Sequence, residues 1–266
     1  RQAFANTSND PEKVWMSQIA NFKNFSRSSP IQDDDSIEFT MVGSQVNQVR
    51  HLVDLNRLAV FTQAGEWSIE GGSAGIVTPT EVNPRQYSYN GSGSLRPLII
   101  DNNALYVQDR GSIVRDLGFD FQVDGYRGND LTIFSSHLFD GYTINDWAYQ
   151  KIPNSIVWSV RSDGVLLGLT YLKEQQILSW HRHDFDGGTV ENVAVIPNGD
   201  EDDLYVVVKR TVDSETKRYI ERYIERFNTR RVDSTNVKSS VFMDSSLSLD
   251  GTNTGSTTMT ISGGTN

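Results

Sequence analysis

The sequence predicts an all-β fold of the β-propeller type, with about five to six four-stranded blades. Two observations carry this prediction. Short β-branched and aromatic runs alternate with Gly, Asn, Asp and Pro, whereas long helical periodicity is scarce. In addition, one apolar strand pattern recurs five times, at residues 14–17, 58–61, 105–108, 157–160 and 204–207.

The spacing of this repeat matches a propeller blade. The second residues of the five segments are 44, 47, 52 and 47 positions apart, and blades are repeats of about 40 to 50 residues. A generic β-sandwich is the alternative, because its strands also recur at short, turn-separated intervals. The longer repeat favours the propeller.

The first unit is incomplete. Ahead of Trp15 the sequence contains one short strand and an Asn-Asp-Pro turn at residues 9–11. We therefore expect the chain to begin inside a blade, and the sequence leaves ring closure open.

The second and third units are strand series broken by glycine. Gly65 and Gly111 are expected in turns, since glycine accepts positive φ without steric cost. The expected strands of the second unit are residues 49–53, 58–62, 66–69 and 87–89, and those of the third are residues 98–100, 105–108 and 112–117.

The fourth unit shows the hairpin pattern most clearly. An apolar strand at residues 156–160 is followed by an Arg-Ser-Asp-Gly turn at 161–164 and a returning strand at 165–171. Asp-Gly is a strong hairpin signal because a tight turn needs positive φ. A further strand at 177–181 follows the polar residues 173–176.

The fifth unit is expected to contain strands at residues 193–196, 204–210 and 218–223, with a loop at 211–215. After it the composition changes. We assign residues 1–231 to the propeller-like domain and residues 232–266, rich in Ser, Thr and Gly, to a linker or the start of a further β domain. The apolar patches of that last segment are residues 241–243 and 259–261, and the linker is the favoured interpretation.

A basic run overlaps the last expected strand. Its members are Lys217, Arg218, Arg222, Arg226, Arg230 and Arg231. Four of these arginines fall at i, i+4 spacing beside two glutamates, so a helix competes with the strand at 218–223. The run is either a solvated face with local ion pairs or a surface that docks onto an acidic neighbouring subunit.

Composition excludes several classes of protein. The chain has 266 residues, a formal net charge of −10 and no cysteine, so disulfides, cysteine-ligated zinc and thiol catalysis are excluded. The negative charge argues against a surface that wraps DNA tightly. No run of apolar residues approaches the roughly 18 that a membrane helix needs, so we expect no membrane partner.

His181 and His183 are the best candidates for metal ligands, since residues two apart on a strand share a face. A metal site needs further ligands, and Asp184, Asp186, His51 and His137 are the nominal ones. The alternative is a polar outer strand that faces solvent or a neighbouring subunit. We expect no bound metal and no cofactor.

Two acidic clusters have oxygen-rich compositions of the kind that calcium prefers, at residues 33–35 and 200–203. Neither has the spaced pattern of an EF-hand loop, and solvated loops are the favoured interpretation. No nucleophile elbow or phosphate-binding glycine loop occurs, and no spacing singles out a catalytic triad. We therefore assign no catalytic residue and expect a protein that is not an enzyme.

The tryptophans have two interpretations, as blade core or as platforms for carbohydrate. They are Trp15, Trp67, Trp147, Trp158 and Trp180. Core is favoured, because large aromatic rings dominate the packing of β domains.

Short stretches spread over the chain up to residue 223 carry a family resemblance. The clearest are residues 148–150, 158–171, 180–183, 193–197 and 218–222, and shorter ones lie at 14–17, 22–25, 33–37, 65–67, 78–80 and 107–112. They resemble structural proteins of tailed bacteriophages, of the nozzle or tail-tube type with a β-propeller domain. Residues 242–245 and 257–263 look like the approach to a small further β domain.

The resemblance implies a virion structural protein located in the phage tail. It would form part of an oligomeric ring or conduit for DNA ejection, beside the portal, an adaptor or other tail proteins. DNA would pass through the lumen without specific binding, and the acidic charge would suit that role. The alternative function is a host-glycan-binding or glycan-cleaving propeller on the virion surface.

Overall fold

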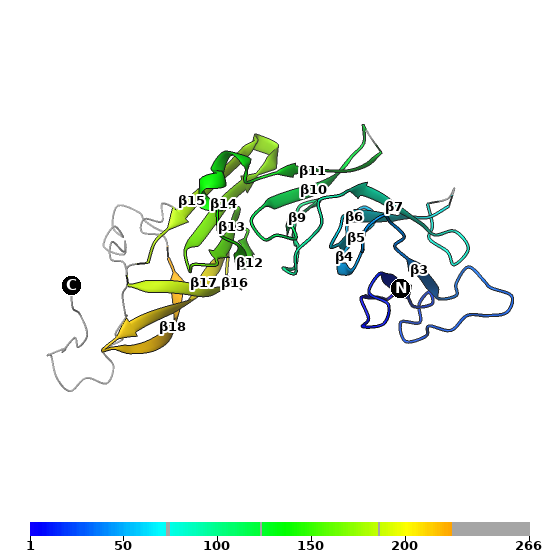
Figure 1. Cartoon of the computed structure of the whole chain (residues 1–266), viewed down its shortest axis with the longest axis horizontal. Helices are drawn as coiled ribbons and strands as arrows, with labels where there is room; N and C mark the ends of the chain where they lie inside the picture. The colour runs from blue at the N-terminus through cyan, green and yellow to red at the C-terminus, as the bar shows by residue number, and fades with distance from the viewer. Residues whose placement is uncertain (73–74, 123, 186, 225–266) are drawn as a thin grey trace. The chain divides into compact units, whose positions relative to one another are not determined.

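The computed structural model describes residues 1–72, 75–122, 124–185 and 187–224. Strands make up 53% of the structure and helix 4%, so the all-β prediction is confirmed (Figure 1). The chain divides into two compact units, Arg1–Asn145 and the part that begins at Asp146. The expected linker at residues 232–266 lies outside the described residues.

The first unit contains three antiparallel sheets whose strands follow one another in chain order. The first sheet comprises β1 (Ala3–Ala5), β2 (Lys13–Met16) and β3 (Ile37–Thr40). The second comprises β4 (Val49–Asp54), β5 (Leu58–Thr62), β6 (Glu66–Glu70) and β7 (Asn83–Ser88). The third comprises β8 (Leu98–Ile100), β9 (Asn103–Val107), β10 (Val114–Asp120) and β11 (Gly125–Asp130), followed by the short helix η1 (Ile133–Leu138).

Two further antiparallel sheets follow in the same order. The fourth sheet begins at the boundary of the units with β12 (Ile144–Gln150) and continues with β13 (Ile156–Arg161), β14 (Leu166–Leu172), the short helix η2 (Lys173–Gln175) and β15 (Ile177–His183). The fifth sheet comprises β16 (Gly188–Asn198), β17 (Glu201–Val212) and β18 (Glu215–Tyr223).

The repeat read from the sequence falls on the same strand of every sheet. Its five copies lie on β2, β5, β9, β13 and β17, each of which is the second strand of its sheet. This strand carries the apolar run because it lies between two neighbours of its own sheet and contacts the core, as buried strands do. The period of the sequence therefore follows the period of the sheets.

Some strand predictions were wrong. The expected loop at residues 211–215 is a two-residue turn, since β17 runs to Val212 and β18 begins at Glu215. Its residues Asp213 and Ser214 both have positive φ, 52° and 64°, as a tight hairpin turn requires. Strand β7 begins earlier than expected, at Asn83, and β11 and β12 were not predicted at all.

The described part of the basic run forms a strand, not the competing helix. Arg218 and Arg222 lie on β18, in register with Lys209 and Tyr205 of β17. The strand interpretation of residues 218–223 is confirmed, whereas Arg226, Arg230 and Arg231 lie outside the described residues.

A backbone contact links consecutive sheets, and we call it the glycine latch. Gly111, between β9 and β10, and Gly164, between β13 and β14, have φ of 81° and 87°. The Gly111 carbonyl accepts the N–H of Ile144 at 2.9 Å, and the Gly164 carbonyl accepts the N–H of Val190 at 2.8 Å. A Cβ would lie 3.0 Å and 2.6 Å, respectively, from the threonine that precedes each N–H group. Both positions therefore need glycine for the turn and for the close approach.

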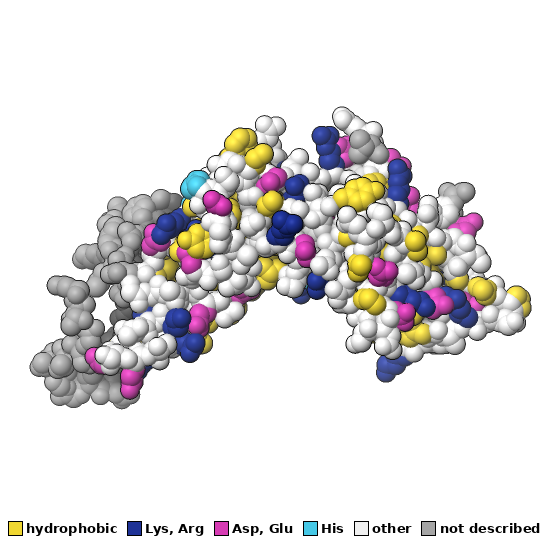
Figure 2. Space-filling model, in the orientation of Figure 1, with side chains coloured by type: hydrophobic (Ala, Val, Ile, Leu, Met, Phe, Trp, Pro, Cys, Tyr) yellow, Lys and Arg dark blue, Asp and Glu magenta, His cyan; other side chains and the backbone are white. Residues whose placement is uncertain are grey.

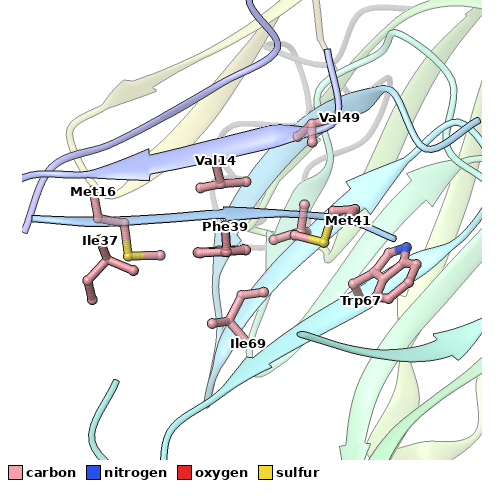
Figure 3. Packing of buried hydrophobic residues seen from close by; sticks show 9 residues of the cluster. Val14, Met16, Ile37, Phe39, Met41, Val49, Trp67 and Ile69 are labelled. Atoms are coloured by element: carbon pink, nitrogen blue, oxygen red, sulfur yellow. The ribbon is translucent and has the colours of Figure 1, made fainter. Parts of the chain in front are cut away.

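Three of the hydrophobic clusters formed by described residues lie between sheets. One joins the first and second sheets, where Val14 and Phe39 pack with Trp67 and Ile69 (Figure 3). A second joins the second and third sheets around Phe61 and Tyr106, whose rings are 5.0 Å apart. The third joins the fourth and fifth sheets. Each buried large apolar side chain contributes about 1.5 to 3 kcal/mol to folding.

The second strands differ in how many of their faces are buried. In β5, β9 and β13 at least four successive residues are buried, so both faces are covered. In β2 and β17 buried residues alternate with more exposed ones, so one face is covered. The first and fifth sheets therefore each have an outer face that the described residues leave largely open to solvent.

Candidate functional site

The two histidines predicted to share a face do so. His181 and His183 lie on β15, and their rings meet with Nδ1 of His181 2.7 Å from Nε2 of His183. The other nitrogen of His183, Nδ1, is 2.8 Å from the hydroxyl of Tyr223 on β18. Trp158 contacts both rings, with centroids at 5.8 Å from His181, in an edge-on arrangement, and at 5.1 Å from His183, in a tilted one. The cluster joins the outer strands of the fourth and fifth sheets.

The histidine cluster lacks the further ligands that a metal site needs. Among the described residues no group of three or more His, Cys, Asp or Glu side chains could hold a metal ion. Asp184 forms an ion pair with Arg182 at 2.8 Å, and His51 bonds the Gly93 carbonyl through Nε2. His137 is basic in the last turn of η1, and Asp186 lies outside the described residues.

Both histidines are held neutral near pH 7. Burial lowers the pKa of His181, and burial together with the neighbouring His181 lowers the pKa of His183 to about 4, against the opposing charge of Asp184. Neutral rings form a continuous chain of hydrogen bonds from Tyr223 through His183 to His181, since each ring then offers one donor and one acceptor. Two protonated rings would place N–H groups face to face and break it.

The first acidic cluster organises the loop between β2 and β3. The Asp35 carboxylate is buried and accepts hydrogen bonds from the backbone N–H groups of Ser28 and Gln32, both at 2.9 Å, and from the side chain of Gln18. The N–H of Gln32 and then that of Ser28 lower its pKa. Arg1 donates to the carbonyls of Asp33 and Asp35. Asp35 is therefore a structural acceptor rather than an exposed ligand.

The second acidic cluster also makes internal bonds. The Asp202 carboxylate accepts the N–H groups of Lys151 and Ile152 at 2.9 and 3.0 Å. The Asp203 carboxylate accepts hydrogen bonds from the side chains of Asn198 at 2.8 Å and Arg222 at 3.3 Å. These carboxylates fix the loop that follows β12 and the turn before β17.

The described part of the basic run forms ion pairs. Arg218 holds Glu191 through two hydrogen bonds of 2.6 and 3.1 Å, and Lys217 lies 3.2 Å from Glu215. These pairs run across strands or along one strand, not along a helix. The docking interpretation of the run stays a prediction.

Three of the five tryptophans are core residues. Trp67, Trp147 and Trp158 are buried, as the core interpretation predicts. Trp15 and Trp180 are half-buried.

A buried polar group that sequence reasoning missed lies between the second and third sheets. Glu66 is 1% exposed, and burial raises its pKa to about 7 against the opposing effects of the Tyr106 hydroxyl and Arg115. Ser88 donates to Oε2 of Glu66. Oε1 of Glu66 and the hydroxyl of Tyr106 are both buried. Nothing in the pattern Gly-Glu-Trp distinguishes a buried glutamate from an exposed one.

A second missed cluster surrounds Arg57 at the turn between β4 and β5. Its guanidinium pairs with Glu70 at 2.6 Å and with Asp124 at 3.2 Å. The Tyr87 hydroxyl donates to the same Glu70 carboxylate, and the Tyr126 hydroxyl bonds the backbone of Arg57. Burial and Glu70 raise the pKa of Tyr87, so its hydroxyl stays protonated. The cluster joins the second sheet to the turn between β10 and β11.

The surface shows no single concentration of one charge on the visible face, where Lys and Arg are interspersed with Asp and Glu (Figure 2).

A hollow of about 370 Å³ lies in the first unit beside Gly93, Asp109, Arg110 and Thr143. No helix of the described residues is long and apolar enough to cross a membrane.

Comparison with protein-family models gives no match, and a search of curated proteins gives none either.

Proposed function

We propose that the chain is a virion structural protein of a phage tail, where it forms part of a ring or conduit for DNA ejection. The observation that carries the proposal is the serial arrangement of five antiparallel sheets, with apolar clusters between the first, second and third sheets and between the fourth and fifth. Such packing makes each of the two units stiff, since close-packed interiors resist deformation. The assignment to a tail rests on the sequence resemblance.

The polar clusters agree with a scaffold. Asp35, Asp202 and Glu70 each bind groups of their own chain, which fixes loops and turns in place. Carboxylates engaged in this way are not poised as an acid and a base on either side of a substrate. This favours assembly over catalysis.

The charge of the chain suits a DNA conduit. With a net charge of −10, a ring of copies repels the phosphate backbone instead of binding it. Partners would be further copies of the chain together with the portal, an adaptor or other tail proteins.

Mass spectrometry of purified virions, combined with electron microscopy of the same particles, tests the proposal. We expect the protein in the particle at a copy number that fits a ring, with density in the tail. Absence from virions, or a copy number of one or two spread outside the tail, would refute it.

The second candidate function, glycan binding on the virion surface, is favoured by the Arg57 cluster. Two carboxylates, a guanidinium and two tyrosine hydroxyls meet there beside Phe119, whose ring lies 5.2 Å from Arg57. Because Tyr87 is protonated and Glu70 is bound to Arg57, the cluster is suited to binding more than to cleavage. Screening host-surface glycans with the wild type and with Glu70→Gln separates the two functions, and measurable hydrolysis would exclude a purely structural role.

A further inference from the structure

We propose that the outer faces of the first and fifth sheets bind each other between two copies of this chain. The proposal deepens the ring function and rests on it, since it names the surface by which one copy meets the next. Both faces are described above as open, and each carries an apolar centre.

The outer face of the first sheet is aromatic. In β1 and β2, Phe4 and Trp15 are register partners on the face opposite the core, while Ala3 and Ala5 pack inward. Phe4 is 50% exposed, and its ring lies 5.8 Å from that of Phe25 in the loop held by Asp35. The hydrogen bonds to Asp35 hold this loop in place, so the rings of Phe4 and Phe25 stay exposed to water. Exposure of neighbouring apolar rings is unfavourable unless a partner covers them.

The outer face of the fifth sheet has an apolar centre between basic residues, since Lys209, Arg218 and Arg222 share this face. Val207 of β17 is in register with Ile220 of β18, and Ile220 is 79% exposed. Tyr205 lies two residues from Val207 on the same face, in register with Ala194 of β16. The opposite face, with Val206 and its neighbours, is buried against the fourth sheet.

The chain itself shows what covers such a face. Each of the three hydrophobic clusters is formed by one sheet packed against the next, and the second strands of the inner sheets are buried on both sides. An open sheet face with an apolar centre is therefore matched in chemistry by another sheet face of the same kind.

Charge favours these two faces as the place where copies meet. Two chains of net charge −10 repel each other, so contact costs least where the surface is locally balanced. On the first sheet Glu38 is paired with Lys13 at 2.9 Å and with Arg27 at 3.1 Å. On the fifth sheet Arg218 and Arg222 are paired with Glu191 and Asp203.

The contact is heterologous, because the two faces differ. A heterologous contact leaves one unused face at each end of a dimer, so further copies add until the rotation closes a ring or a filament grows. An isologous contact would stop at the dimer.

Two charge-introducing variants test the assignment, Phe4→Asp on the first sheet and Ile220→Asp on the fifth. Both positions are exposed and lie on edge strands, so the fold should persist, and circular dichroism checks this. Phe121→Asp is the matched control. Phe121 is 88% exposed and lies in the turn between β10 and β11, and the substitution introduces the same charge. Sedimentation over a concentration series measures association.

We expect the wild type and the control to associate with rising concentration. Each face variant alone should associate about tenfold more weakly or worse, as loss of a central apolar anchor does. An equimolar mixture of the two variants should form heterodimers with wild-type affinity and nothing larger, because one intact pair of faces remains. Wild type that stays monomeric, face variants that behave as the control, or a mixture that fails to pair would each overturn the proposal. Virion mass spectrometry reports on the tail function independently of these outcomes.

Discussion

Glu66 in the first unit and His183 in the second are both ionisable groups removed from water, yet pH acts on them in opposite directions. Burial raises the pKa of Glu66 from 4.5 to about 7 and lowers that of His183 from 6.5 to about 4. In both cases burial disfavours the charged form. One physical cause therefore gives these two groups, and through them the two units, opposite responses to acid.

The sign follows from proton linkage. Folded Glu66 holds a proton that the unfolded chain releases above pH 4.5, so the stability of the first unit falls as pH rises from 4.5 to 7. Folded His183 rejects a proton that the unfolded chain binds below pH 6.5, so the stability of the second unit falls as pH drops from 6.5 towards 4. Between pH 4.5 and 6.5 both groups oppose folding in part.

Trp158→Ala should give the largest effect, because it removes a buried ring that contacts both histidines. Trp158 is 4% exposed, and truncation of a buried tryptophan costs about 3 to 5 kcal/mol of stability. Denaturant unfolding of the second unit, followed by hydrogen exchange of β13 and β17 amides, measures the loss. Phe121→Ala, an exposed aromatic in the first unit, is the control; equal losses for both would contradict the buried role of Trp158.

Glu66→Gln should remove the part of the pH response of the first unit that Glu66 causes, the fall in stability between pH 4.5 and 7. Each pKa unit corresponds to about 1.36 kcal/mol. The shift from 4.5 to about 7 therefore allows the variant to be more stable than the wild type at pH 8 by at most about 3 kcal/mol. Below pH 4.5 the variant and the wild type should be alike. Hydrogen exchange of β9 amides at several pH values measures this, with the exposed Glu81→Gln as control, and a variant that keeps the wild-type slope would refute it.

His183→Phe should reduce the acid sensitivity of the second unit while keeping an aromatic ring in the cluster, and the part due to the buried His181 should remain. Because the ring is half-buried, solvent screening reduces the expected gain near pH 4.5 to about 1 to 2 kcal/mol. At pH 7 the variant should be less stable, since the partners of both ring nitrogens are lost. His137→Phe, at an exposed histidine, should leave the acid response unchanged, and an unaltered response in His183→Phe would count against the cluster.

Tyr223→Phe should have the smallest effect. It deletes one hydrogen bond to His183 and keeps the ring, which costs about 1 kcal/mol at pH 7. The acid sensitivity should remain, because burial of His183 is unchanged. Loss of that sensitivity in this variant would show that the hydroxyl, rather than burial, sets the pKa.

The sequence predicted the second strands well and the outer strands poorly. Runs such as residues 58–61 and 157–160 are apolar because they are buried, so they stand out from their surroundings. Strands β11 and β12 contain Asn, Asp and Gly and are partly exposed, so no period distinguished them from loops. Their pairing depends on neighbours that only the fold supplies.

The candidate sites divide in the same way. That His181 and His183 share a face follows from their spacing, but their partner Tyr223 is 40 residues further along the chain from His183. The burial of Glu66 could not be predicted, because it depends on Tyr106 and Ser88 from other strands. Which residues of one strand share a face can be predicted from their spacing, whereas a contact between sheets cannot.

The glycine latch has a consequence for how the chain tolerates change in length. Each latch bonds the tip of one hairpin to the first strand of the next sheet. The residues between these two points therefore form a segment whose two ends are held together, which we call an excursion. These excursions are residues 112–143 and 165–189, which differ in length although the latch is the same. Peptide tags or whole inserted domains should therefore be accepted within them, at turns such as that of Phe121, while even a single residue added beside Gly111 or Gly164 should disturb the junction of two sheets.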